Sequence, residues 1–234
     1  MTYSGASDYS FSDNLTYMLK DPKVAMKIII GSLVSLVPIL SWAASGYALR
    51  VINNIRARQE TPLPEWSGEF GKFFADGLMV WLIQLIYSLP MLLILMISVV
   101  PILLASVASN SGKTDALTGL MAGGTCLVFL VAIVYALALV FWVQGVLVNY
   151  AIKGNFAAAF AFGEILAIVK ANIRKMAMTL VALLVASFAV GLVAGVLSII
   201  PCIGQLAGLL IGMVAAFYML LVVAYSCGHI ARAI

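Results

Sequence analysis

Few side chains in this sequence could carry out chemistry. Nucleophiles, general bases and metal ligands would have to come mainly from three cysteines, nine acidic residues and one histidine among 234 residues. The histidine, His229, lies between Cys227 and Arg232 at the end of a long apolar run. A zinc site needs three or four ligands, and a catalytic triad needs a nucleophile, a histidine and an acid held together. Neither set can be completed here, so we expect no catalytic residue and no metal, and we interpret this cluster as facing lipid headgroups.

Two other motifs give no cofactor site. Cys126 and Cys202, like Cys227, lie in or beside apolar segments without a C-x-x-C spacing, which is typical of small buried side chains. Ser111-Gly112-Lys113-Thr114 resembles the end of a phosphate-binding loop, but Val107 stands where that motif needs a glycine. We therefore expect no cofactor.

The composition excludes a soluble domain. Hydrophobic residues make up 64% of the chain and charged residues only 9%, whereas soluble domains carry about 25% charged residues. The net charge of +4 is spread thinly between apolar blocks, while a nucleic-acid surface needs clustered basic residues. The sequence predicts an integral membrane protein whose partners are membrane lipids and not nucleic acid.

Runs without charge predict a single all-α membrane domain over residues 1–234, a polytopic helical bundle with two amphipathic surface helices. The expected segments are an amphipathic surface helix at 1–23, a short hairpin or kinked span at 24–56, a cytoplasmic loop at 57–77, two long spans at 78–152, an interfacial connector at 153–175 and a helical hairpin at 176–230.

The basic residues decide between the two interpretations of 24–56. If this segment crosses the membrane once, the thirteen basic residues divide nine to four between the two sides. If it turns back near Pro38, they divide twelve to one, with only Lys113 outside. The positive-inside rule prefers the second division. We therefore favour about six membrane helices, with both termini in the cytoplasm.

Small residues recur at every fourth position in the last two predicted helices. They are Ser187, Gly191 and Gly195 in the first helix and Gly204, Gly208, Gly212 and Ala216 in the second. Such spacing lets helix backbones approach closely. We predict tight helix packing here, within the chain in preference to between chains because the two stripes adjoin in sequence.

Three polar residues, Gln84, Gln144 and Asn149, fall within the predicted spans. They are expected to form hydrogen bonds between helices, or alternatively to line a solute path. No acidic or basic residue lies centrally in a span, which argues against a proton- or sodium-coupled pump.

The loop at 57–77 has the most distinctive polar sequence. Its prolines hold the chain extended, and Trp66 with the nearby phenylalanines suits the headgroup layer. We expect either a surface network of ion pairs or a docking surface for a partner. The candidate docking residues are Arg50, Arg56, Arg58, Pro64, Glu65, Trp66 and Asp76.

The same region carries a family resemblance. The motifs are Gly46-Tyr47-Ala48-Leu49-Arg50, Leu63-Pro64-Glu65-Trp66 and Asp76-Gly77-Leu78. With these motifs the chain resembles, over most of its length, a family of prokaryotic membrane proteins known only as a domain of unknown function. The resemblance implies a multi-span protein of the cytoplasmic (inner) membrane of a bacterium or archaeon. It carries no activity and no catalytic residue that could be transferred.

The sequence thus favours a non-enzymatic membrane protein, acting as a structural or accessory subunit or as a membrane-organising scaffold. Its partners would be other membrane protein subunits or further copies of the chain. The alternative is a transporter or channel for a small or lipid-like solute, in which Pro38, Pro90, Pro101 and Pro201 would mark broken helices around a central site.

Overall fold

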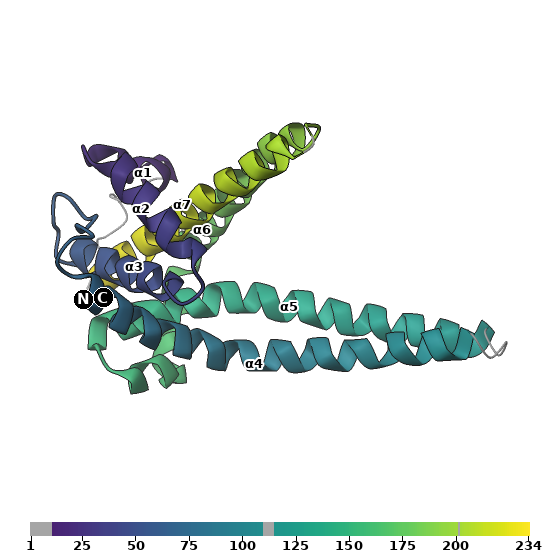
Figure 1. Ribbon diagram of the computed structural model, residues 1–234. Coiled ribbons are helices and arrows are strands. Elements are labelled where there is room, and N and C mark those ends of the chain that lie inside the picture. Colours follow the sequence, from purple (N-terminus) through teal and green to yellow (C-terminus); the bar gives the residue numbers. More distant parts are fainter. Residues whose placement is uncertain (1–10, 110–114, 201) are drawn as a thin grey trace. The chain divides into compact units, whose positions relative to one another are not determined.

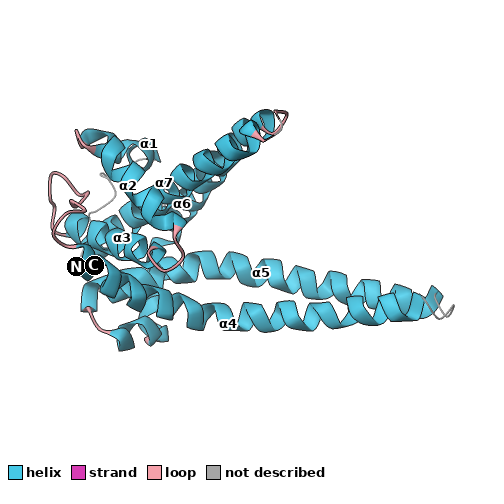
Figure 2. Cartoon of the chain, in the orientation of Figure 1, coloured by secondary structure: helices cyan, strands magenta, loops and turns pink. Residues whose placement is uncertain are grey.

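The structure, a computed structural model, describes residues 11–109, 115–200 and 202–234, which fold into helices joined by loops and turns (Figures 1 and 2). The elements in chain order are α1 (Phe11–Thr16), the 3-10 helix η1 (Tyr17–Lys20), α2 (Val24–Leu36), α3 (Ser41–Arg56), α4 (Phe70–Ser109), α5 (Asp115–Lys153), the 3-10 helix η2 (Phe156–Phe160), α6 (Phe162–Leu197) and α7 (Ile203–Ala233). These ranges contain no strand, which confirms the all-α prediction.

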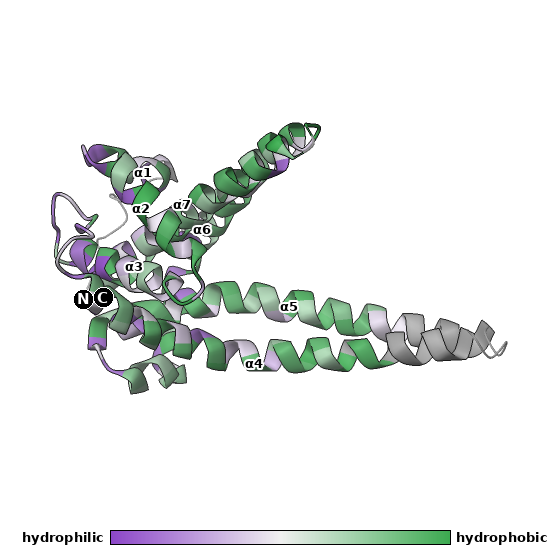
Figure 3. Ribbon diagram, viewed as in Figure 1, coloured by the Kyte–Doolittle hydropathy of each residue, from purple (hydrophilic) through white to green (hydrophobic). Residues whose placement is uncertain are grey.

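Four of these helices are long and apolar enough to cross a membrane. The spans are Phe70–Ile97, Gly123–Lys153, Phe162–Leu197 and Ile203–Ala233. The shortest has 28 residues and is therefore about 42 Å long, more than the roughly 30 Å of a hydrocarbon core. Figure 3 shows apolar residues along these helices and hydrophilic residues along the loop that follows α3. The described residues thus form a multi-span membrane protein, as the composition predicted.

The chain divides into two compact units, which we describe separately. One comprises residues 83–141, the second part of α4 and the first part of α5. Here the Tyr135 hydroxyl donates a hydrogen bond to the Tyr87 carbonyl at 3.0 Å and joins the two helices. Many large apolar side chains of this unit are exposed, as lipid-facing side chains would be. Residues 110–114, between these two helices, lie outside the described residues.

The other unit comprises residues up to 82 and from 142 onward, and its core forms around the second half of α7. α2, α3 and α6 all pack against this helix. Gly31 of α2 lies directly against the ring of Phe217, which is fully buried. On the other side, a Cβ added at Gly228 would lie 2.7 Å from the Cβ of Ile55 in α3. Glycine therefore lets both short helices approach α7 closely.

Two helix boundaries differ from the predicted segments. α4 begins at Phe70, so the loop after α3 ends at residue 69 and not at 77. Lys72 and Asp76 occupy the first two turns of α4, and the charge-free run marked only the apolar part of the helix. A run without charge delimits the part of a helix suited to the membrane, and the helix itself extends beyond it.

The connector expected at 153–175 forms η2 and the first part of α6. After η2 the chain enters α6, which continues from Phe162 into the following span with a kink at Asn172 (φ −121°, ψ 17°). The Asn172 side-chain amide donates to the Ile168 carbonyl at 3.0 Å, a local bond that bends helices. The change from charged to apolar composition therefore falls close to this kink, where two helical stretches meet.

Residues 24–56 form two helices that separate around Pro38. α2 has 13 residues and α3 has 16, so they are about 20 and 24 Å long. Both are shorter than a hydrocarbon core, and α3 is largely buried against the rest of its unit. Whether they enter the bilayer as two further membrane helices stays a prediction.

α3 and α4 meet at a pair of glycines. A Cβ at Gly46 would coincide with the Phe73 carbonyl, and a Cβ at Gly77 would coincide with the Trp42 carbonyl. A Cβ added at Gly46 would lie 2.8 Å from the Gly77 backbone nitrogen, and one added at Gly77 would lie 2.9 Å from the Gly46 backbone nitrogen. The two backbones are in direct contact here, and any larger residue would push the helices apart.

We expect Gly77→Ala to destabilise the protein by about 2–3 kcal/mol, because the added methyl group meets backbone that cannot rotate away. The matched control is Gly71→Ala, six residues earlier in the same helix, where an added Cβ meets nothing within 4 Å. Thermal unfolding in mild detergent, followed by circular dichroism, measures both. Equal midpoints for the two variants would contradict the glycine contact.

Candidate functional site

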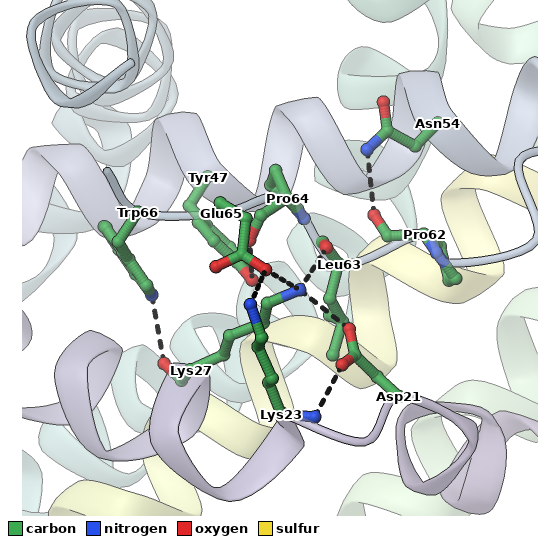
Figure 4. Close-up of polar contacts among 10 residues, drawn as sticks. All are labelled: Asp21, Lys23, Lys27, Tyr47, Asn54, Pro62, Leu63, Pro64, Glu65 and Trp66. Atoms are coloured by element: carbon green, nitrogen blue, oxygen red, sulfur yellow. Dashed lines mark hydrogen bonds and ion pairs between the residues drawn. The ribbon is translucent and has the colours of Figure 1, made fainter. Parts of the chain in front are cut away.

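The loop between α3 and α4 is held in place by its own carbonyl groups. Asn54 Nδ2 donates to the Pro62 carbonyl at 3.0 Å, Lys27 Nζ to the Leu63 carbonyl at 2.8 Å, and the Tyr47 hydroxyl to the Pro64 carbonyl at 3.0 Å. Figure 4 shows these three bonds reaching successive residues of the loop. The two prolines have no N–H and keep the segment extended, so its carbonyls need partners from elsewhere. The loop is thereby fixed to α2 and α3.

Lys27 is the centre of this arrangement. Its side chain is only 7% exposed, and its ammonium group lies 2.8 Å from Asp21 Oδ2 and 3.4 Å from Glu65 Oε1. Lys23 adds a second link to each carboxylate: its backbone N–H donates to Asp21 Oδ1 at 2.8 Å, and its Nζ lies 3.4 Å from Glu65. A buried charge is tolerated when it is paired and hydrogen-bonded, and removing one partner is strongly destabilising.

Asp21 lies between η1 and α2 and is itself buried. Burial alone would raise the pKa of this carboxyl group. The hydrogen bonds from the Lys27 side chain and from the Lys23 backbone, with the charges of both lysines, outweigh burial and lower the pKa below its ordinary value. Asp21 therefore stays ionised opposite Lys27.

Trp66 completes the attachment of the loop. Its ring stacks on Tyr47 with centroids 4.4 Å apart and meets Phe73 edge-on at 5.8 Å, and its Nε1–H donates to the Lys27 carbonyl at 3.0 Å. The side chain is 7% exposed. The prediction that Trp66 faces the headgroup layer is therefore wrong. The indole is an internal anchor because the loop folds back over α2 and α3.

A polar pocket of about 390 Å³ opens beside the loop. Its charged lining residues are Lys27, Arg50, Glu65 and Glu69. Arg50 Nη2 lies 3.5 Å from Glu69 Oε1, so the acids and bases are paired across the opening. The Arg50–Glu69 pair is half-exposed, and such a pair adds little to stability. The arrangement presents a rigid surface of mixed charge, suited to recognising a charged partner.

The structure divides the predicted docking residues between different roles. Arg50, Pro64 and Glu65 line this pocket, and Arg58 lines another one. Arg56 donates to the Ala151 carbonyl at 3.1 Å and so caps the end of α5. Asp76 lies two turns inside α4 and lines neither pocket.

The predicted polar residues of the spans are also placed. Asn149 is buried and donates to the Ala158 carbonyl at 2.8 Å and to Glu164 Oε2 at 3.0 Å, so it joins three segments of the chain. The Gln144 carbonyl accepts a contact from Cys227 Sγ at 3.8 Å. Gln84 is half-buried on α4 and belongs to the other unit. For Asn149 the structure thus shows contacts between helical segments, as the first interpretation expected.

The glycine stripes are not packed as predicted. A Cβ at Gly191, Gly195 or Gly212 would meet nothing within 4 Å, and one at Gly208 would meet only the Ala194 methyl at 3.8 Å. Gly204 alone lies against backbone, at the Leu197 carbonyl. Ser187 and Ala216 are both exposed, although the Ser187 hydroxyl lies 3.6 Å from Met219 Sδ. The spacing identifies small helix faces, but most of these faces point away from the rest of the chain.

Several residues of the site carried only a weak signal in the sequence. Lys27 was visible as one charge at the beginning of an apolar helix, and Asp21 as an acid six residues earlier. Asn54 does not stand out by type or spacing, and Tyr47 was visible only as a member of the motif at 46–50. Within 11–109, 115–200 and 202–234, no three His, Cys, Asp or Glu side chains are grouped as a metal would require.

The comparisons with known proteins give a family and no activity. The sequence profile of the family described as "Protein of unknown function (DUF4013)" matches residues 29–199. No curated protein and no solved structure is significantly similar to the chain. The matched range includes all three motifs quoted from the sequence. The residues of these motifs form the contact between Gly46 and Gly77 and part of the loop between α3 and α4.

The lowered pKa of Asp21 makes stability depend on pH. Its carboxylate stabilises the fold at neutral pH, and we expect this contribution to be lost as the pH falls below about 4, through the folded-state pKa. Asp21→Asn should lower the thermal midpoint at pH 7 and make it less sensitive to acid. Glu60→Gln, an exposed loop substitution, is the control. An acid dependence in Asp21→Asn as steep as in the wild type would argue against the role of Asp21.

Proposed function

Because the chain belongs to the DUF4013 family, whose function is unknown, we propose that it is a non-enzymatic integral membrane protein acting as a structural or accessory subunit or a membrane-organising scaffold. The observation that carries this proposal is the outward face of α6. Ser187, Gly191 and Gly195 lie exposed on this helix, and the residues of α6 that are buried are others, such as Thr179 and Ala182.

An exposed small-residue face on a lipid-facing helix suits contact with another helix. In lipid, helices associate through close packing because there is no hydrophobic force between them, and glycine permits the closest approach. Since a Cβ added at Gly191 or Gly195 meets nothing within 4 Å among the described residues, the second helix would come from another subunit or from a second copy of the chain.

The loop between α3 and α4, residues 57–69, supports the same function. In the proposed topology it lies on the side of the membrane where the basic residues gather. Its backbone is fixed by three side-chain hydrogen bonds, and the carboxylates of Glu65 and Glu69 remain half-exposed beside Arg50. A preorganised charged surface binds without the entropic cost of ordering a loop. It is suited to docking a soluble or membrane partner.

A second candidate function rests on an apolar groove of about 550 Å³ between α2, α6 and α7. It is lined by Ile28, Ala186, Ala189, Val190, Leu210, Ile211, Val214, Ala215, Tyr218 and Met219. This volume and lining suit an acyl chain, so the protein would bind or carry a lipid-like solute.

We place the protein in the cytoplasmic membrane of a prokaryote, with six membrane helices and both termini in the cytoplasm. Basic residues support this topology, because it leaves only Lys113 outside. In this arrangement α2 and α3 form a shallow hairpin that turns at Pro38 and thins the bilayer locally.

Labelling of an introduced cysteine tests the topology. In a background where Cys126, Cys202 and Cys227 are replaced by serine, Ser41→Cys should react with a membrane-impermeant maleimide only from the outside. Lys72→Cys, on the first turn of α4, is the cytoplasmic control and should react only from the inside. Clear labelling of Ser41→Cys from the cytoplasm would rule out the hairpin.

Substitution of the α6 glycines tests association. We expect Gly191→Leu to leave the thermal midpoint unchanged, because an added side chain starts in open space, and to remove most of the companion protein or second copy. The measurement is purification in mild detergent, with light scattering for mass and mass spectrometry for companions. Gly123→Leu on α5, where an added Cβ also meets nothing within 4 Å, is the matched control.

Two results would count against the subunit function. The first is a wild-type protein that purifies as a lone monomer, and the second is a Gly191→Leu variant that keeps every companion. A co-purifying lipid without any protein would favour the second candidate function.

A further inference from the structure

A second polar pocket, of about 280 Å³, lies where η1, the turn after α3 and the last turn of α7 come together. Its titratable and charged lining residues, apart from two tyrosines, are Lys20, Arg58, Glu60, His229 and Arg232. With a neutral histidine this gives three positive charges against one negative charge. The pocket therefore has a net positive lining, unlike the pocket beside the loop, where acids and bases are paired.

Aromatic rings form one fixed wall of this pocket. Tyr17 stacks on Tyr225 with centroids 4.2 Å apart, and Tyr225 lies against His229 at 4.4 Å. The Tyr17 hydroxyl donates to the Leu221 carbonyl at 3.0 Å, which holds the ring in place. Tyrosine rings beside basic residues at the end of an apolar helix are typical of the boundary between membrane and water.

Arg58 closes the end of α3 in the left-handed conformation of a Schellman cap, a position at which glycine is usual. Its φ is +60°, in the left-handed region that favours glycine. Two bonds close the end of α3 around it: the Arg58 N–H donates to the Ile55 carbonyl at 3.0 Å, and the Gln59 N–H donates to the Asn54 carbonyl at 3.0 Å. Glycine would form this cap with less strain. An arginine here is better explained by what its side chain does.

The side chain of Arg58 lines the pocket, together with Lys20. In the part of the chain that the structure describes, no carboxylate forms an ion pair with either residue. Both positive charges thus remain available to an anion. The partial negative charge at the end of α3 opposes an anion only weakly, because its last carbonyls already accept the capping bonds.

We propose that this pocket binds the phosphate group of an anionic phospholipid at the cytoplasmic face of the membrane. Arginine and lysine donate charge-assisted hydrogen bonds to phosphate oxygens, and the tyrosines contact the glycerol region. A zwitterionic lipid binds less well because its cationic headgroup meets a positively charged lining. This site is independent of any association with other chains.

The test uses the full-length protein, freed of lipid in mild detergent. Native mass spectrometry measures binding of added phosphatidylglycerol, phosphatidylcholine and inorganic phosphate, and thermal unfolding measures stability. We expect phosphatidylglycerol to bind about fivefold to tenfold more weakly to Arg58→Gly than to the wild type. Without lipid, Arg58→Gly should unfold at the same temperature as the wild type or higher, because glycine suits the backbone at this position.

Two control variants make the result specific. Arg58→Lys keeps the charge and should keep most of the binding. Lys72→Ala removes one positive charge outside the pocket, on the first turn of α4, and should bind phosphatidylglycerol like the wild type. Undiminished binding by Arg58→Gly, or equal binding of phosphatidylglycerol and phosphatidylcholine, would overturn the site. A comparable response to inorganic phosphate would overturn the lipid as its ligand.

Discussion

The fold of the polar end of this protein depends on the burial of the Lys27 ammonium group. A charge in an apolar helix needs acceptors, and these come from Asp21 before the helix and from Leu63 and Glu65 in a distant loop. Once these groups surround Lys27, the loop has no freedom to move. Trp66 is then held against Tyr47, and its N–H bonds the backbone of the same lysine. One buried charge thereby joins α2, α3 and the loop into a single packed region.

The three family motifs make physical sense together in this region. Gly46 and Gly77 allow the backbones of α3 and α4 to touch, while Tyr47 and Trp66 stack and Pro64 offers its carbonyl to Tyr47. In the structure the three motifs form one contact, in which two helices and a loop are fixed to one another.

The class of protein and its long helices could be predicted because they follow from local composition. The contacts of the site could not, since the Lys27 side chain bonds a carbonyl 36 residues away and nothing in the spacing identifies Leu63 as the acceptor. Composition placed the change from the connector to the following span at residue 175, and the kink between the two helical stretches of α6 lies at Asn172. The glycine spacing correctly marked small faces. Which face of α6 packs against α7 depends on tertiary packing. Small residues at every fourth position do not specify that face.

The position of Lys27 also bears on how the protein is made. A lysine in a helix that enters the bilayer alone raises the cost of insertion by about 2.5–3.5 kcal/mol at the membrane centre, and less near its surface. Its acceptors at Leu63 and Glu65 are synthesised only after α2 and α3. α2 therefore gains its full set of partners late, when the loop has left the ribosome. The packing of α2 against the loop is therefore completed only after both α2 and α3 have been synthesised.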